Sequence, residues 1–370
     1  MKKIKVACFG LGQDQFKFVK KLCNDFKVIG FDEDSKSDAS KIVYKYYSTS
    51  FKKKKKILSI LRKEKVKKIF SFATEAPINL IGFLNTKLNL EGIKYDLTSI
   101  ITNKYTLKNR LKDKIFQPKF FKKVPSNFDN KKFLIKPLTG SAAKNIRFLD
   151  INNKSNISKN DYIEEYINNG KMYAIDGFCI KGIFHFVSLS EKKKFSKNIF
   201  IDKIIKFNIN KKKIIKKASA LVQEHCSILK ILNAPIHWEF LYFNKKFFSI
   251  DFHIRGPGSG FYTKLMHRLT IPGTYYIQRD LNKINNSFRK RKFYSYVYFI
   301  NSLNEINFLK TLIPKTTIKY EFNLFKEKMN SNKNLDKEIN RIGVVYFKFN
   351  NYVDFITKSK FLDKKFKNHS

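Results

Sequence analysis

The first hundred residues alternate apolar runs of strand length with segments of helical periodicity, and this alternation constrains the fold more than any other feature. The apolar runs lie at residues 4–9, 28–32 and 68–72. The helical patterns lie at residues 16–22, 57–61 and 80–84. Strands that alternate with helices form open, mostly parallel sheets. We therefore expect an α/β domain with a mostly parallel sheet over residues 1–100.

A glycine-rich turn follows the first apolar run. Gly10 and Gly12 stand in this turn, and Asp32 ends the second run. In NAD(P)-binding domains such a turn meets the pyrophosphate, and the acidic residue binds a ribose hydroxyl. Gln15 occupies the position where that pattern has its third glycine. Structural glycines in a βα turn therefore explain the motif, and an NAD(P)-dependent oxidoreductase is kept as a further hypothesis.

The pattern changes after about residue 100, where strands follow one another through turns. Residues 133–137 form an apolar strand that ends in a turn of small residues, and residues 146–149 are its expected hairpin partner. A mainly antiparallel sheet and one amphipathic helix are expected from the segments at residues 162–167, 172–178, 183–189 and 214–232. This α+β unit spans residues 101–280, and a small C-terminal α+β unit spans residues 281–370.

Two adjacent strands, at residues 236–240 and 250–255, carry the residues with the clearest chemistry. Strand side chains alternate between faces, so Asp251, His253 and Arg255 are expected on one face. Glu239 lies on the neighbouring strand and provides a second carboxylate. His237 shares its face and is expected to be a hydrogen-bonded core histidine. Carboxylates, a divalent cation and an arginine suit phosphoryl transfer, whereas the alternative is a solvated face of an amphipathic hairpin.

The net charge of +46 raises the question of nucleic-acid binding. Lysines are spread over almost every segment, together with abundant Asn, Ile and Phe. Such a composition is typical of a codon bias toward AT-rich DNA, whereas nucleic-acid binding requires basic residues gathered on one surface. The composition therefore argues against a nucleic-acid partner.

The four cysteines are scattered and show neither a metal-binding nor a disulfide spacing. No apolar run approaches the ~20 residues that cross a bilayer, and no secretory signal is recognised at the start of the sequence. We expect a globular cytoplasmic protein with free thiols and no membrane segment.

The order of the motifs resembles the ATP-grasp superfamily, in particular its carboxylate-amine ligases with an N-terminal Rossmann-like domain. Four motifs carry the resemblance, at residues 102–105, 135–137, 163–167 and 237–255. The resemblance covers nearly the whole chain. It implies a two-lobed ATP-grasp fold with ATP held between the lobes. The segment at residues 74–77 follows a parallel strand and is expected to face this cleft, because open sheets bind ligands at the carboxyl ends of their strands.

The resemblance also implies roles for individual residues. Lys104 and Lys136 match the lysines that contact the phosphates, and Ser141, in the loop of small residues after Lys136, is a further expected nucleotide-binding residue. Glu164 and Glu165 match the hinge that holds adenine, partly through backbone groups. Catalytic roles are implied for Lys136 and for Arg255, which matches the arginine that steadies the acyl-phosphate. Metal roles are implied for Glu239, Asp251 and His253.

The sequence departs from the family at several of these positions. The family usually has Glu and Asn where this chain has Asp251 and His253. Mg²⁺ is the expected ion, and Mn²⁺ is a second candidate because it accepts a nitrogen ligand more readily. Ala142 and Asn145 stand where glycines are usual, and Met172 replaces a ribose-binding Glu. These changes leave a non-catalytic nucleotide- or substrate-binding descendant as an alternative to an active ligase.

The activity that the resemblance implies is an ATP-dependent joining of two small molecules. ATP would phosphorylate a substrate carboxylate, and an amine would attack the acyl-phosphate, with release of ADP and phosphate. The expected partners are therefore a small carboxylate and a small amine. A homodimer is the common default for a soluble assembly.

Overall fold

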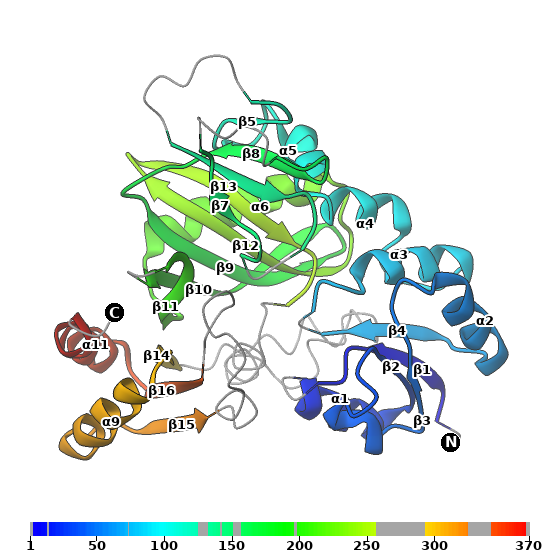
Figure 1. The fold of residues 1–370 in the computed structure, drawn as a ribbon, viewed down its shortest axis with the longest axis horizontal. Coiled ribbons are helices and arrows are strands. Elements are labelled where there is room, and N and C mark those ends of the chain that lie inside the picture. Colours follow the sequence, from blue (N-terminus) through cyan, green and yellow to red (C-terminus); the bar gives the residue numbers. More distant parts are fainter. Residues whose placement is uncertain are drawn as a thin grey trace.

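The computed structural model describes residues 3–12, 15–72, 74–124, 132–140, 143–150, 157–195, 198–256, 293–324 and 342–367. These residues form three sheets (Figure 1). A four-stranded sheet near the N-terminus lies apart from an eight-stranded sheet, and a second four-stranded sheet lies against the latter.

The N-terminal sheet is entirely parallel and has the order β3-β2-β1-β4. Its strands are β1 (Lys5–Phe9), β2 (Lys27–Asp32), β3 (Lys45–Ser48) and β4 (Lys68–Ser71). The helices that cross between them or follow them are α1 (Phe16–Asp25), α2 (Lys54–Glu64) and α3 (Ile78–Lys87). Separate apolar clusters cover the two faces of this sheet. The predicted parallel α/β architecture is thus confirmed.

The turn after β1 depends on a glycine and on Asp32. Gly10 has a φ of +85°, and a Cβ at this position would lie 2.6 Å from the Gln15 side-chain nitrogen. The Leu11 amide donates a hydrogen bond to the Asp32 carboxylate over 2.6 Å. In this structure Asp32 therefore fastens the βα turn, which fits the structural explanation of the glycine motif.

Two short helices, α4 (Tyr95–Ile101) and α5 (Lys104–Leu111), lead from the N-terminal domain to the small antiparallel sheet. This sheet has the order β5-β8-β6-β7. Its strands are β5 (Phe120–Phe121), β6 (Phe133–Pro137), β7 (Arg147–Phe148) and β8 (Asp161–Glu165). Leu134 pairs with Phe148, so the predicted hairpin of β6 and β7 is confirmed.

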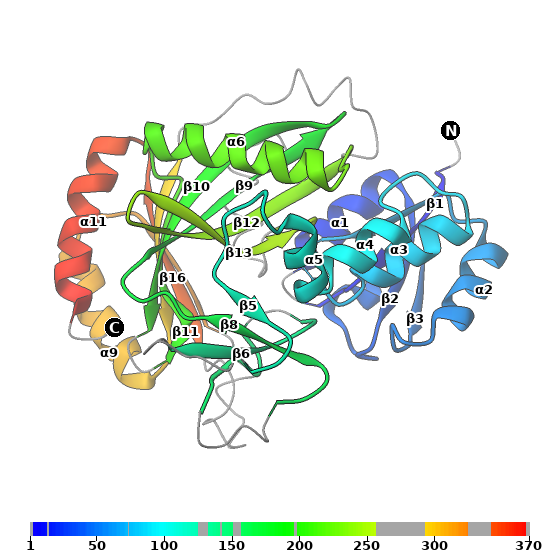
Figure 2. The ribbon, with the colours of Figure 1, turned by 90° about the horizontal axis from the view of Figure 1, so that it is seen from above.

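The large sheet has the order β13-β12-β9-β10-β11-β14-β16-β15, and its neighbouring strands are antiparallel. The first five are β9 (Lys171–Ile180), β10 (Ile183–Phe195), β11 (Asn198–Phe207), β12 (Ala234–Phe243) and β13 (Lys246–His253). The amphipathic helix α6 (Lys212–Ile228) buries Ala218, Val222 and Cys226. Figure 2 shows α6 on one face of the sheet and the small sheet on the other, at the end formed by β12 and β13.

The C-terminal strands continue the large sheet, although the sequence suggested a small unit of its own. They are β14 (Tyr294–Ile300), β15 (Tyr320–Leu324) and β16 (Gly343–Phe349), with helices α9 (Leu303–Leu312) and α11 (Tyr352–Phe366) beside them. Ile204 of β11 pairs with Tyr298 of β14. This pairing satisfies backbone groups that an open strand edge would leave exposed. The unit is thus continuous with the sheet, and its boundary at residue 281 stays a prediction.

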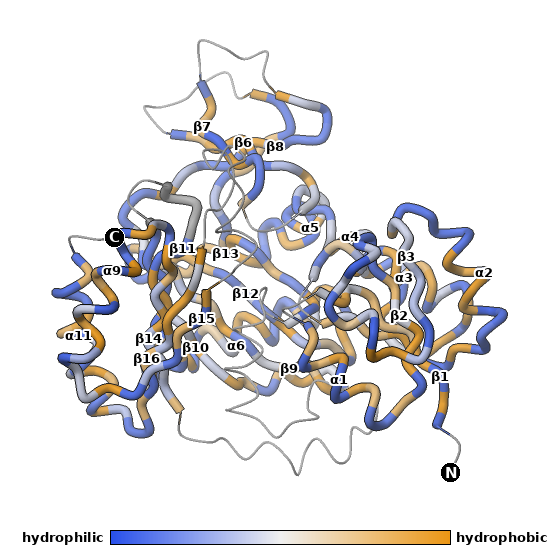
Figure 3. The backbone as a smooth tube through the Cα atoms, turned by 60° about the horizontal axis from the view of Figure 1, so that its bottom comes forward, coloured by the Kyte–Doolittle hydropathy of each residue, from blue (hydrophilic) through white to orange (hydrophobic). Residues whose placement is uncertain are grey.

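Hydrophilic stretches are distributed over the whole structure. Figure 3 shows them on α2, on α11 and around the small sheet, while apolar stretches alternate with them along the helices and strands. This distribution agrees with a bias in composition. Within the described parts of the chain, no helix combines the length and the apolar character needed to cross a membrane.

Candidate active site

The candidate site begins where β12 and β13 pair. Glu239 lies opposite Asp251, and His237 lies opposite His253. Lys104, in the first turn of α5, reaches across from the helix, and its Nζ lies 2.7 and 2.5 Å from the two Asp251 carboxylate oxygens. Asn103 caps this helix by accepting a hydrogen bond from the Thr106 amide. The structure thus brings together the predicted phosphate lysine and a predicted metal carboxylate.

The charges of Lys104 and Asp251 depend on each other. Burial alone raises the pKa of Asp251, but Lys104 and His253 more than offset burial, and the pKa lies below its usual range. Burial lowers the pKa of Lys104, whereas Asp251 and Glu75 raise it more, and the net pKa is raised. Both groups are therefore charged at neutral pH.

A second charged cluster lies in the small sheet. Lys136 of β6 contacts the Glu164 carboxylate of β8, and Lys108 of α5 lies 2.7 Å from its other oxygen. Glu164 is almost completely buried, and the Tyr162 hydroxyl donates to it over 3.3 Å. Burial raises the pKa of Glu164, but Lys108 and Lys136 offset burial and hold it below its usual range. Lys136 and Glu164 therefore lie together beside α5.

The remaining predicted nucleotide contacts are only partly described. Glu165 is half-buried, and its amide donates to the Lys119 carbonyl over 2.8 Å. Ser141 and Ala142 lie outside the described residues. Ala143 and Asn145, in the same loop, have φ values of +57° and +60°. Asn145 thus keeps a left-handed conformation at a position where the family usually has glycine.

Glu239 is held between a lysine and a histidine. Its carboxylate contacts Lys192 Nζ of β10, and its Oε1 lies 3.2 Å from His237 Nε2. The opposite nitrogen of His237 lies 2.6 Å from the buried Asp176 carboxylate of β9. Burial lowers the pKa of His237, but Asp176 and Glu239 together outweigh burial and the pKa is raised. Burial raises the pKa of Glu239, but Lys192 and His237 keep it well below its usual range.

The N-terminal domain contributes Glu75 to the site, from the segment after β4. Glu75 Oε2 lies 3.1 Å from Arg255 Nη2 and 3.2 Å from His253 Nδ1. His253 Nε2 in turn lies 3.5 Å from Asp251, so Asp251, His253 and Arg255 share one face. Arg255 is almost completely buried, and its Nε has no hydrogen-bond partner within the described segments. This orphaned donor suits a ligand with an anionic oxygen.

The donor atoms at this face are of the types that bind divalent cations. Glu239 and Asp251 are ionised and lie opposite each other on paired strands. Burial, followed by the charge of Arg255, lowers the pKa of His253, so its imidazole is neutral at neutral pH. Carboxylate oxygens suit Mg²⁺, and the added nitrogen suits Mn²⁺. In the described part of the chain, no three His, Cys, Asp or Glu side chains are grouped as a ready-made metal site. The three metal assignments stay predictions.

Sequence reasoning missed Lys108, Lys192 and Asp176. Lys108 lies one turn after Lys104 on the same helix, so helical spacing pointed to it. Asp176 is an isolated acidic residue in an apolar strand, which is a weaker signal. Lys192 belongs to a run of three lysines that has the appearance of a solvated face, and no sequence signal distinguishes it.

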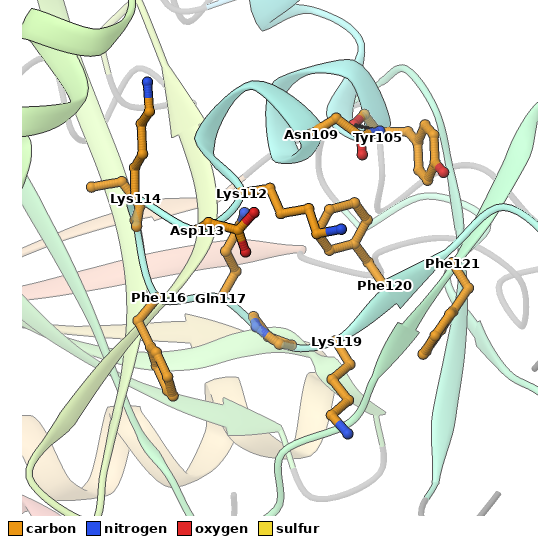
Figure 4. Close-up of a pocket in the computed structure, with 12 residues that line it drawn as sticks. Tyr105, Asn109, Lys112, Asp113, Lys114, Phe116, Gln117, Lys119, Phe120 and Phe121 are labelled. Atoms are coloured by element: carbon orange, nitrogen blue, oxygen red, sulfur yellow. Dashed lines mark hydrogen bonds between the residues drawn. The ribbon is translucent and has the colours of Figure 1, made fainter. Parts of the chain in front are cut away.

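A cavity of about 600 Å³ lies beside the site, along α5 and the segment that leads to β5. Tyr105, Asn109 and residues 112–121 line it (Figure 4). Its lysines are exposed, and in a chain this rich in lysine they do not indicate a particular ligand. Its lining includes Tyr105, whose ring lies 6.2 Å from that of Tyr162 near Glu164. The cavity thus borders the charged cluster without containing it.

No family model and no curated protein matches the sequence, but the fold has clear structural relatives. An L-amino acid ligase from Bacillus licheniformis is similar, with a TM-score of 0.73, 16% identity, and coverage of 99% of this chain and 98% of that one. A carboxyaminoimidazole ribonucleotide synthase from Aspergillus clavatus, complexed with ATP, has a TM-score of 0.72, 13% identity and 99% coverage of both chains. A phosphoribosylglycinamide synthetase from Anaerococcus prevotii has a TM-score of 0.71, 13% identity and 98% coverage of both chains. The chain therefore has the fold of the ATP-grasp superfamily.

Proposed function

We propose that the chain is an ATP-dependent ligase that activates a small carboxylate as an acyl-phosphate and joins it to an amine. The contact between Lys104 and Asp251 carries this proposal. The two residues are 147 positions apart in the sequence, and their side chains meet within 2.7 Å. A lysine for phosphate and a carboxylate for a divalent cation are the pair that phosphoryl transfer requires in one place.

The similar structures support the same activity class. Their names include a ligase and two synthetases or synthases of small molecules, and one of them was solved with ATP. We extend ATP to this chain because Lys104, Lys108 and Lys136 provide cations at the junction of α5 and the small sheet. A divalent cation held by Glu239, Asp251 and His253 would neutralise phosphate charge when bound.

The proposed reaction has two steps. A carboxylate oxygen of the first substrate attacks the γ-phosphorus of ATP, the bond to the β,γ-bridging oxygen breaks, and ADP leaves. The amine nitrogen then attacks the acyl carbon and loses a proton, and phosphate leaves with the former carboxylate oxygen. Lys104 and Lys136 would hold the phosphates. The unpaired Nε of Arg255 would donate to the anionic oxygen that develops at phosphorus or carbon.

The substrates are proposed only as classes, a small carboxylate and a small amine. The cytoplasmic location and a homodimer stay predictions from the sequence. Adenine binding by Glu164 and Glu165 stays part of the proposal, and the buried carboxylate of Glu164 would position Lys108 and Lys136.

The test begins with thermal stabilisation by a non-hydrolysable ATP analogue with Mg²⁺ and, separately, with Mn²⁺. ADP and phosphate release would then be measured with a panel of acids and amines. Release that requires one acid and one amine together supports the ligase. Nucleotide binding without ADP release across the panel would favour the non-catalytic alternative. Stabilisation by NAD(P) in place of ATP would favour the oxidoreductase.

A further inference from the structure

Each predicted metal carboxylate is paired with one lysine, and the two lysines come from opposite sides. Lys104 reaches Asp251 from α5. Lys192 reaches Glu239 from β10, across the intervening strand β9. The resemblance gives Lys104 a role on a phosphate, whereas nothing assigns a role to Lys192. Because each lysine contacts one of the two carboxylates, we asked what Lys192 could do in the same site.

The position of Lys192 is built into the sheet. Its side chain is almost completely buried, and its Nζ also lies 3.2 Å from the Asp202 carboxylate of β11. Asp202 is itself paired with Lys194 over 2.8 Å. The next residue, Lys193, points to the opposite face and pairs with Asp363 of α11 over 3.0 Å. Lys192 and Lys194 thus lie on the site face, and Lys193 does not.

The charges at this face balance in the absence of a metal ion. Lys192 and Lys194 neutralise Glu239 and Asp202. A divalent cation on Glu239 would place two further positive charges beside the Lys192 ammonium, and like charges at such distances repel strongly in a protein interior. Asp202 would then face both Lys192 and Lys194, so these three side chains would carry one excess positive charge beside the cation.

We propose that Lys192 is a substrate-binding residue that occupies Glu239 until a divalent cation binds there, and then holds the carboxylate or acyl-phosphate of the substrate. The inference rests on the proposed function, because it takes Glu239 as a metal ligand. It places the carboxylate substrate over β10 and β11, on the side of Glu239 away from Lys104. A short ammonium-to-anion contact is the interaction that a buried lysine supplies best.

The first experiment measures Mn²⁺ binding to the whole protein without nucleotide, by electron paramagnetic resonance. Lys192→Met removes the competing charge, so Mn²⁺ should bind roughly tenfold more tightly or better. Lys193→Met is the matched control and should leave the affinity within about twofold of wild type. The fold of Lys192→Met is checked by thermal unfolding, and Lys192→Arg keeps the charge and should retain the wild-type affinity.

The second experiment uses inorganic phosphate as a probe of the anion, with Mn²⁺ bound. Phosphate affinity should fall roughly tenfold in Lys192→Met and return in Lys192→Arg. If Lys192→Met binds Mn²⁺ with the same affinity as the wild type, this inference alone is overturned. An absence of Mn²⁺ binding in the wild type would overturn the metal site of the proposed function as well. Unchanged phosphate affinity would overturn the substrate-binding role.

Discussion

Two regions of the large sheet both bury lysines against carboxylates, but they do so differently. At the β12 and β13 end, the Glu239 and Asp251 side chains keep 21% and 25% of their exposure. In the middle of the sheet, where β11 pairs with β14, Lys203 is completely buried between Glu305, Asn301 and the ring of Tyr298. The first arrangement leaves carboxylate oxygens accessible to a ligand, and the second closes the pair on all sides. The comparison separates an ion pair available for binding from one that only supports the fold.

The largest expected effect is on activity at the accessible end. Asp251→Asn and Glu239→Gln keep the side-chain shape but remove a charge that a divalent cation needs. Turnover should fall about a thousandfold or more in each variant, which corresponds to roughly 4 kcal/mol of transition-state stabilisation. The free energy of unfolding should change by only about 1 kcal/mol, because both carboxylates reach solvent. ADP release and urea unfolding measure the two effects.

The exposed Lys213 supplies the control for this prediction. Lys213→Ala should leave both turnover and stability at their wild-type values. Wild-type turnover in Asp251→Asn and in Glu239→Gln would show that the accessible end is not a metal site. The exposure of its carboxylates would then have no role in catalysis.

The closed pair of Lys203 and Glu305 should respond in the opposite way. Lys203→Met leaves the buried Glu305 carboxylate without its cation, and breaking a buried pair typically costs about 3–5 kcal/mol. Urea unfolding should reveal this loss, while the affinity for the ATP analogue stays unchanged. The double variant Lys203→Met with Glu305→Gln should regain much of the stability. A loss well below ~1 kcal/mol in the single variant would mean that full burial of the ion pair does not distinguish the two regions.

The sequence predicted those parts of the fold that depend on local pattern. The alternation of strand and helix over residues 1–100 and the hairpin of β6 and β7 follow from side-chain periodicity and turns. The pairing of β14 with β11 was not predicted, because it joins distant segments and leaves no local signal. The extension of β10 through Lys192 was missed because a lysine run gives no strand pattern.

The same distinction applies to the site. Lys104, Asp251 and Arg255 were chosen from ordered motifs, and the structure brings them into one connected set of contacts with Glu75 and His253. The contact between Asp176 and His237 joins residues on two strands that only the folded sheet aligns. Spacing therefore identified the motif residues, whereas the residues that support them required the pairing of strands.

On the opposite face of β12 and β13, a buried histidine of α6 makes stability depend on pH and so tests whether this face is closed to solvent. His225 of α6 is completely buried, its Nδ1 lies 2.7 Å from the Leu221 carbonyl, and its ring stacks on Phe252. Burial lowers its pKa from 6.5 to about 4. Between these values the unfolded chain binds more protons than the folded protein. The contribution of neutral His225 to the free energy of unfolding is thus full above pH 6.5. It falls as the pH drops toward 4, by about 3 kcal/mol in total.

Urea unfolding at about pH 7, 5.5 and 4.5 measures this dependence. His225→Gln removes the titrating ring and should flatten the curve relative to wild type over this range. His185, on β10, is half-buried and burial also lowers its pKa, so His185→Gln should reduce the dependence by less than His225→Gln does. Equal pH dependence of stability in His225→Gln and wild type would contradict the burial of His225 between α6 and the sheet.

The smallest expected effect concerns Lys136. Its cluster with Glu164 and Lys108 is buried, like the Lys203 pair, but lies in the predicted nucleotide site, like Asp251. Lys136 is nearly buried, yet Lys108 also contacts Glu164, so Glu164 keeps a cation when Lys136 is changed. Lys136→Met should therefore leave stability close to wild type. A charge-assisted hydrogen bond to phosphate contributes about 1.5–3 kcal/mol, so ATP affinity should fall roughly tenfold to a hundredfold. Calorimetric titration with the ATP analogue measures this loss, and Lys132→Met, at an exposed residue just before β6, should bind as wild type does. Unchanged affinity together with a large loss of stability would place Lys136 with Lys203, as a support of the fold that does not contact the nucleotide.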